Sequence, residues 1–339
     1  VTRYDMLSDL KEGGTFLLNS HWTAEQMNEM LPAEMKRALA TKKAKFYNID
    51  AIGIAAKVGM GNRTNTIMQA AFFKLAQVIP YEDADQYMKA AAKKSYAKKG
   101  DAVVKKNWDA IDAARALGGL VEIPVPAEWA NATTGAVAVS VPATKHFDEV
   151  IKPILAHNGD SLPVSAFNPA GVVPTGTTQY EKRGIAVNVP EWIAANCIQC
   201  NQCSLICPHA CIRPILVENG KAVPDGFETK DALLSPAEKG KYQFRMQVSP
   251  LDCTGCGNCA DICPSKTKAL VMKPLETQAK EEKNWEFAMK QPVVKTGVNT
   301  ASVKGSQYLQ PLFEFSGACA GCGETPYVKL VTQLFGDRM

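Results

Sequence analysis

The sequence predicts a multidomain protein of mixed class, in which an open α/β domain, a small connector and an α+β domain follow one another along the chain. Strand-like and helical segments alternate in the first part, as they do in an open α/β sheet. Proline and turn residues dominate residues 122–190. All eleven cysteines lie between 197 and 322, so these three regions differ in their chemistry.

Length and composition indicate a globular protein. The chain has 339 residues, of which 46% are hydrophobic and 21% charged, enough for one large core or for two to three smaller ones. The formal net charge is only +4. Lysine runs such as "KAAAKKSYAKKGDAVVKK" alternate with apolar residues at helical spacing and lack interleaved aromatic residues. We therefore expect solvated helix faces here and no nucleic-acid partner.

No apolar run approaches the roughly 18 residues that a membrane span needs, and "VTRYDMLSDL" lacks the apolar core of a signal peptide. We therefore expect a cytoplasmic protein with no membrane partner. The chain starts with valine, and it ends just after the amphipathic segment "TPYVKLVTQLFGDRM". These ends predict a piece of a longer polypeptide.

Residues 1–125 carry the pattern of the open α/β domain. Buried strands are expected in "GGTFLLNS" and "KAKFYNIDAIGI". The segment between them has helical periodicity, with Thr23 and Gln26 placed as a capping box and Pro32 placed to kink or divide the helix. Two further helices are expected over 64–78 and 82–99.

Two stretches, residues 59–62 and 122–190, are expected to have little regular secondary structure. "GMGN" at 59–62 lacks the third glycine and the G-K-[ST] ending of a phosphate loop, so we expect a simple loop before a helix. The stretch from Glu122 to Pro190 includes "SLPVSAFNPAGVVPTGTTQ" and shows no dominant period. It predicts a connector with short strands.

The cysteines predict metal binding. They form two groups of four, one pair and the single Cys211; the groups are Cys197, Cys200, Cys203 and Cys207, then Cys253, Cys256, Cys259 and Cys263. Neighbours two residues apart are poorly placed for disulfides, and the missing signal peptide favours a reducing compartment. Zinc would suit two C-x2-C pairs separated by a loop. Each group here has three closely spaced cysteines and a fourth followed by Pro208 or Pro264, which is the spacing of bacterial ferredoxins.

In the ferredoxin pattern the fourth cysteine of each group ligates the other cluster. We therefore assign two [4Fe-4S] clusters in a ferredoxin-type domain, the first to Cys197, Cys200, Cys203 and Cys263, the second to Cys207, Cys253, Cys256 and Cys259. An apolar jacket is expected to exclude water, formed by Ile198, Leu205, Ile206 and Ile262, although isoleucines are also ordinary core residues. Small residues are expected to bring the backbone close to the second cluster: Thr254, Gly255, Gly257 and Asn258.

The segment between the two groups, 212–252, exceeds what a bare ferredoxin needs. Its turn signals "ENGK" and "PDGF" and the strand-like "YQFRMQV" predict a surface excursion beside the clusters, either a docking face or a tolerated insertion. Cys211 belongs to no motif and is predicted to be a buried free thiol, as against a ligand. His209 is likewise predicted to be structural.

Cys319 and Cys322, in "FSGACAGCGETPY", are half of a metal site. Only Cys211 is unclaimed in this chain, so the other ligands are expected elsewhere. Glycines at 317, 321 and 323 permit a tight loop, and zinc or redox chemistry remains open for this pair.

Six segments in this order resemble the large single-chain form of the pyruvate:ferredoxin (flavodoxin) oxidoreductases, over essentially the whole chain: "FLLNS", "GNRTNTIMQAAFFKLA", "FNPAGVVPTGTTQYEKRGIA", "CIQCNQCSLICPHACIRP", "LDCTGCGNCADICP" and "FSGACAGCGETPYVKL". The resemblance implies four parts. These are the end of a gamma-like α/β domain (1–125), a connecting domain (126–183), the two-cluster ferredoxin domain (184–305) and the start of a thiamine diphosphate domain (306–339).

The same resemblance implies the function. The family oxidatively decarboxylates pyruvate with coenzyme A to acetyl-CoA and CO2, and this segment would pass single electrons to ferredoxin or flavodoxin. Cys319 and Cys322 would be two of four ligands to a third [4Fe-4S] cluster, while thiamine diphosphate and Mg²⁺ would bind elsewhere in a homodimeric full-length protein. The segment alone would be inactive. A stand-alone electron-transfer subunit and an oxidoreductase for another 2-oxoacid remain alternatives.

Overall fold

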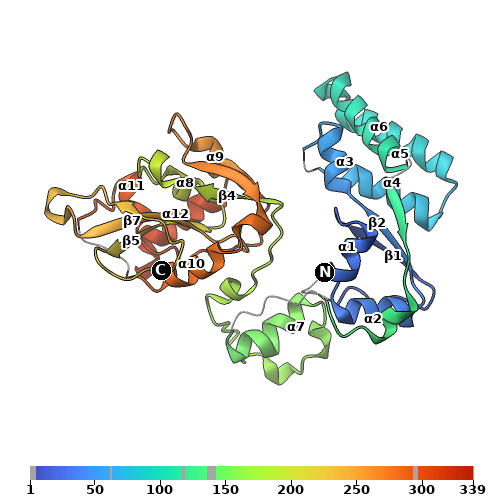
Figure 1. Cartoon of the computed structure of the whole chain (residues 1–339), viewed down its shortest axis with the longest axis horizontal. Helices are drawn as coiled ribbons and strands as arrows, with labels where there is room; N and C mark the ends of the chain where they lie inside the picture. Colours follow the sequence, from blue (N-terminus) through green and yellow to red (C-terminus); the bar gives the residue numbers. More distant parts are fainter. Residues whose placement is uncertain (1–4, 62, 116–118, 136–142, 293–296, 339) are drawn as a thin grey trace. The chain divides into compact units, whose positions relative to one another are not determined.

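The computed structural model describes residues 5–61, 63–115, 119–135, 143–292 and 297–338. The chain divides into two compact units, Val1–Ser140 and Val141–Met339, each of which mixes helices and strands (Figure 1). No helix in the described part of the chain has both the length and the apolar character needed to cross a membrane.

A mixed three-stranded sheet organises the first unit. β1 (Thr15–Asn19) pairs in parallel with β2 (Lys45–Ile49), which pairs antiparallel with β3 (Leu120–Ile123). The two predicted strands are confirmed, but only Leu18 of β1 is buried. The prediction that the second strand extends over 51–54 is wrong. These residues start α3 (Ala51–Lys57), because the Asp50 carboxylate accepts the Gly53 N–H at 2.8 Å and caps a helix there.

The crossover between β1 and β2 is helical, as predicted, and is divided at the proline. Thr23 and Gln26 form the capping box of α1 (Ala24–Met30), with hydrogen bonds of 3.0 and 3.3 Å. Pro32 is the residue before α2 (Ala33–Thr41). Met27, Leu31 and Leu39 are fully buried in one hydrophobic cluster of this unit.

The second hydrophobic cluster of this unit lies among the helices that follow β2. They are α3, α4 (Asn65–Ala76), α5 (Tyr81–Tyr96) and α6 (Asp101–Arg115). Both predicted helices are confirmed, the second continuing as a 3-10 turn to Lys99. The described part of "GMGN" forms a turn after α3, and Asn62 lies outside the described residues. Lysines of the predicted solvated faces are exposed, including Lys93, Lys94, Lys105 and Lys106.

The prediction of short strands over 122–190 is confirmed only at the two ends of that stretch, where β3 ends at Ile123 and β4 (Asn188–Trp192) begins. The described residues between them, 124–135 and 143–187, contain no strand. Short 3-10 turns and the helix α7 (Lys152–Leu155) occupy this region instead. Proline lacks the N–H that a sheet ladder needs, and the local Phe167 N–H to Val164 carbonyl bond of 3.1 Å is typical of the turns here. Trp129 packs into the core of the first unit, whereas Phe147 packs against Tyr180 in the second.

The second unit contains two antiparallel sheets. β4 (Asn188–Trp192) pairs with β8 (Leu270–Pro274), so strands that flank the two cysteine groups lie side by side. The other sheet has the order β5 (Ile212–Glu218), β7 (Tyr242–Val248), β6 (Lys230–Asp231). Besides α7, the described part of this unit contains the helices α8 (Gln202–Ile206), α9 (Asn258–Ile262), α10 (Glu281–Met289), α11 (Val303–Ser306) and α12 (Thr325–Phe335).

The segment 212–252 differs in part from its prediction. The strand over "YQFRMQV" is confirmed as β7, and both turns form, with Lys221 donating to the Glu218 carbonyl and Phe227 to that of Pro224 at 3.1 Å each. The predicted surface excursion holds only for the middle of the segment, where residues 218–226 and 228–243 are exposed or half-buried. Its two ends are not at the surface, because Leu216, Phe244 and Met246 belong to the main hydrophobic core of the unit. Sequence analysis does not predict β5, because Pro214 lies within it and proline is unfavourable in a paired strand.

Candidate metal centre

The two cysteine groups adopt the same backbone form. In each, a residue in the left-handed region, Asn201 (φ 61) or Gly257 (φ 82), precedes a five-residue helix, α8 or α9. Each helix ends at a cysteine with extended backbone, Cys207 or Cys263, where the following proline prevents continuation. The helices pack against one another (Figure 1). Equal spacing in the sequence therefore becomes a repeated structure.

The first set of thiols combines the two motifs. Burial raises the pKa of Cys203, and three nearby thiolates raise it further: Cys197, Cys200 and Cys263. Backbone N–H groups turn toward sulfur, with Gln199 donating to Cys197 at 3.4 Å and Ala269 to Cys263 at 3.3 Å. Cys263, from the second motif, thus acts on Cys203 of the first, and its membership of the first set stays a prediction.

The second set is the reciprocal one. A cavity with apolar walls is lined by Cys207 from the first motif and by Cys253, Cys256 and Cys259 from the second. Burial raises the pKa of Cys259, and the thiolates of Cys207 and Cys253 add to this effect. Gly255 donates its N–H to Cys253 Sγ at 3.4 Å. Gly255 has φ +71, and a Cβ there would lie 2.8 Å from the Asn188 carbonyl oxygen, so this position has no room for a side chain. The predicted close approach of the backbone to the second cluster stays a prediction.

The donor chemistry fits an iron–sulfur cluster. Each set has four thiols with backbone N–H groups directed at sulfur, and such hydrogen bonds set cluster potentials. Within the described ranges, no three Cys, His, Asp or Glu side chains converge as ligands of a single metal ion would. The thiols are instead spread around the walls of a space.

Cys211 is a fifth thiol of the second cavity. It is buried, as predicted, and its Sγ lies 3.5 Å from that of Cys207. The Cys211 thiol hydrogen bond lowers the pKa of Cys207 to about 5, while the same contact raises the pKa of Cys211. His209 is fully buried, and its Nδ1 lies 3.1 Å from the Ser316 carbonyl oxygen, to which it donates.

The prediction of an apolar jacket is wrong for two of its four residues, which are exposed to solvent. Ile198 is 55% exposed and Ile262 is 43% exposed, while Leu205 and Ile206 are half-buried. A residue next to a ligating cysteine points away from the site when the thiol points in, so the walls come from other elements. Ile212, Val248 and Met272 line the second cavity, and all three belong to strands.

The third pair lies beside the second set. Cys319 is exposed, and Cys322 stands just before α12, where the N–H groups of Thr325 and Glu324 lower the pKa of its thiol. The Gly321 N–H faces the Cys256 thiol, and a Cβ at Gly321 would lie 3.6 Å from the Cys256 Cβ. The loop that carries the pair is thus packed against a cysteine of the second motif.

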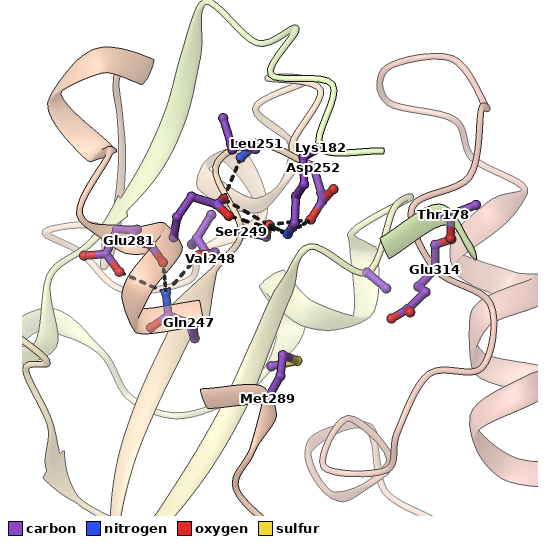
Figure 2. Close-up of polar contacts among 12 residues, drawn as sticks. Thr178, Lys182, Gln247, Val248, Ser249, Leu251, Asp252, Glu281, Met289 and Glu314 are labelled. Atoms are coloured by element: carbon purple, nitrogen blue, oxygen red, sulfur yellow. Dashed lines mark hydrogen bonds and ion pairs between the residues drawn. The ribbon is translucent and has the colours of Figure 1, made fainter. Parts of the chain in front are cut away.

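Buried polar groups behind the second motif were not predicted. Figure 2 shows Lys182 directed at Asp252 and Ser249, and the Gln247 amide directed at Glu281. Arg213 forms an ion pair with Glu314, and Lys329 of α12 is 2% exposed. Lysine and arginine in a sequence are usually surface residues, so only the structure reveals these.

Comparison with known proteins shows which families this chain resembles. Residues 1–117 match the pyruvate ferredoxin/flavodoxin oxidoreductase family, residues 133–186 a domain of unknown function, and residues 196–267 the 4Fe-4S dicluster domain. The whole chain is 59% identical to pyruvate:ferredoxin oxidoreductase of Moorella thermoacetica and 49% identical to pyruvate-flavodoxin oxidoreductase of Enterobacter agglomerans. Over its entire length the chain is homologous to these oxidoreductases.

The chain spans 29% of the length of either of these pyruvate oxidoreductases. It is also 47% identical over its whole length to the mitochondrial pyruvate dehydrogenase [NADP(+)] of Euglena gracilis, of which it covers 19%. The dicluster match includes both groups of four cysteines, and Cys319 and Cys322 lie outside it. The family likeness thus reaches the residues that carry the predicted clusters.

Proposed function

We propose that the chain is the electron-conducting segment of a pyruvate:ferredoxin (flavodoxin) oxidoreductase, with two [4Fe-4S] clusters held by crossed ligand sets. The first set is Cys197, Cys200, Cys203 and Cys263; the second is Cys207, Cys253, Cys256 and Cys259. One observation carries the proposal: Cys207 of the first group lines a cavity together with Cys253, Cys256 and Cys259 of the second group. The electrostatic effect of Cys263 on Cys203 supports the reciprocal exchange. Clusters so held supply one-electron redox chemistry at low potential.

The residues around each set have separable tasks. Backbone N–H groups of Gln199, Gly255 and Ala269 point at cysteine sulfurs and stabilise negative charge there. The strand residues Ile212 and Val248 exclude water from the second set. Low solvent access and directed donors together set the potential.

The positions of the cysteines favour a direction of electron flow. Cys319 and Cys322 would supply two of four ligands to a third cluster, the others lying outside this chain. The contact between Gly321 and Cys256 favours entry of electrons at the second set. Crossed ligation then brings the first set next in line, because Cys207 and Cys263 join the two sets.

Exit of electrons is favoured at the first set. Three exposed apolar residues lie around it: Ile198 (55%), Leu233 (57%) and Val303 (52%). The Leu233 N–H donates to Gln199 at 2.8 Å and its carbonyl accepts from Lys304 at 2.5 Å, which ties these segments together. We propose that ferredoxin or flavodoxin, the carriers named in the relatives, docks on this surface.

The activity of the whole protein follows from its relatives. It would oxidise pyruvate with coenzyme A to acetyl-CoA and CO2, using thiamine diphosphate and Mg²⁺ bound outside this chain, as a cytoplasmic homodimer. Turnover of the native protein on pyruvate, compared with 2-oxoglutarate, tests the substrate. Equal or faster turnover of 2-oxoglutarate would reject pyruvate as the specific substrate.

An anaerobic count of iron and acid-labile sulfide tests the cluster proposal. The 339-residue chain should hold about eight of each, corresponding to two cubanes. Iron near zero, with zinc bound in its place, would refute the electron-transfer function.

A further inference from the structure

α12 has an unusual buried stripe. The residues that it buries are Thr325, Lys329 and Gln333, all polar, while Tyr327 and Phe335 are exposed. These buried residues are four apart and therefore share one face of the helix. Gln333 donates to the Leu309 carbonyl at 2.9 Å. Thr325 and Gln333 have neutral side chains, so Lys329 is the charged member of the stripe.

The Lys329 ammonium group binds the end of α8. Its Nζ donates to the Ser204 carbonyl, to that of Leu205 at 3.1 Å and to that of Cys207 at 3.3 Å. Three carbonyl acceptors require three N–H donors, which an ammonium group has and a neutral amine lacks. Lys329 is therefore a cation, and it fixes the turn that presents the Cys207 thiol.

Lys329 differs from the other buried cations of the second unit. Lys182 pairs with Asp252, Arg213 with Glu314 and Arg245 with Glu281. Among the residues that the structure describes, no carboxylate forms an ion pair with Lys329.

A buried cation without a counter-charge costs several kcal/mol. Burial lowers the pKa of Lys329, and the negative groups that oppose this shift are the thiolates of Cys207, Cys211 and, as the smallest effect, Cys203. Its natural counter-charge is therefore the anionic group that Cys207 would hold.

We propose that Lys329 is a positioning residue that sets the potential of the second cluster. This inference rests on the proposed function. Its three hydrogen bonds hold the Cys207 turn, and its positive charge favours the form of the cluster that has gained one electron. The same helix begins beside Cys322, whose loop touches Cys256. One helix thus links the third pair to the second cluster and makes that cluster the better electron acceptor.

The test is a redox titration of the native holoprotein, with dithionite as reductant and electron paramagnetic resonance as readout. The second cluster is identified as the signal that Cys256→Ser alters. In Lys329→Met its potential should fall by at least 59 mV, the shift for a tenfold change in a one-electron equilibrium. Lys304→Met is the matched control, because Lys304 lies near Cys197 and Cys200 of the first set. It should leave this potential unchanged.

An unchanged potential in Lys329→Met, or an equal fall in the Lys304→Met control, would overturn the inference. If Lys329→Met does not retain its clusters, Lys329→Gln is titrated in its place under the same 59 mV criterion. The Gln amide still donates to two carbonyls and lacks the charge. Failure of the proposed function is distinguishable, since the unmodified protein would then contain no iron.

Discussion

The ammonium group of Lys182 lies 2.5 Å from a carboxylate oxygen of Asp252, the residue that directly precedes Cys253. Both side chains are buried, and the Ser249 hydroxyl donates to the same carboxylate at 2.6 Å (Figure 2). The Lys182 ammonium also lies over the rings of Trp285 and Phe315, at 5.7 and 5.6 Å from their centres. A residue of the connector therefore anchors the start of the second cysteine motif.

Substitution of this lysine should destabilise the second unit. Lys182→Met leaves the Asp252 carboxylate buried without its ion-pair partner, which costs about 3–5 kcal/mol of unfolding free energy. Hydrogen exchange of peptides that cover β7 and α10 measures the loss. Lys241→Met is the control, because Lys241 is exposed and pairs with Glu238 at 3.4 Å. It should cost about 1 kcal/mol or less. Equal losses in both variants would contradict the anchoring role.

Glu282 should make the stability of this unit fall as the pH rises. Burial raises the pKa of Glu282 above the ordinary 4.5, although Lys182 opposes the shift. The folded state therefore binds this proton more tightly than the unfolded chain. The resulting stabilisation is complete below pH 4.5 and is lost as the pH rises through the higher folded-state pKa.

Glu282→Gln removes this titration. The Gln side chain keeps an oxygen that can accept the Leu251 N–H, as Glu282 Oε1 does in the unmodified protein at 3.1 Å. Urea unfolding at several pH values should show the variant gaining stability relative to the unmodified protein from pH 4.5 upward. A difference that stays constant over that range would refute the prediction.

Sequence analysis predicts features that depend on neighbours in the chain. The Thr23–Gln26 capping box and the repeated cysteine motifs use contacts a few residues apart, so their spacing contains the necessary information. Lys329 instead meets carbonyls more than a hundred residues earlier, and its sequence position is that of an ordinary amphipathic helix. Ile198 shows the opposite error, since this apolar residue next to a predicted ligand is exposed. Long-range packing determines both cases.

The crossed arrangement predicts a specific loss on substitution of Cys263. Cys263→Ala should remove the cluster of the first set, because this thiol is the proposed fourth ligand of that set and acts on Cys203. Iron should fall from about eight to about four per 339-residue chain. The remaining paramagnetic resonance spectrum should match that of Cys200→Ala. A spectrum that matches Cys256→Ala would mean that each motif holds its own cluster.

The second cavity has five thiols, and a cubane takes four, so Cys211 provides the sharpest test of the ligand set. Cys211→Ala should keep about eight iron atoms, because Cys207, which precedes the proline, occupies the position of the fourth ligand in the ferredoxin pattern.

The control is Cys207→Ala combined with Cys211→Ala, since Cys211 Sγ lies 3.5 Å from Cys207 Sγ and can replace it in a single variant. The double variant should retain about four iron atoms, those of the first set. Reduced iron in Cys211→Ala alone would identify Cys211 as a ligand and remove Cys207 from the second set.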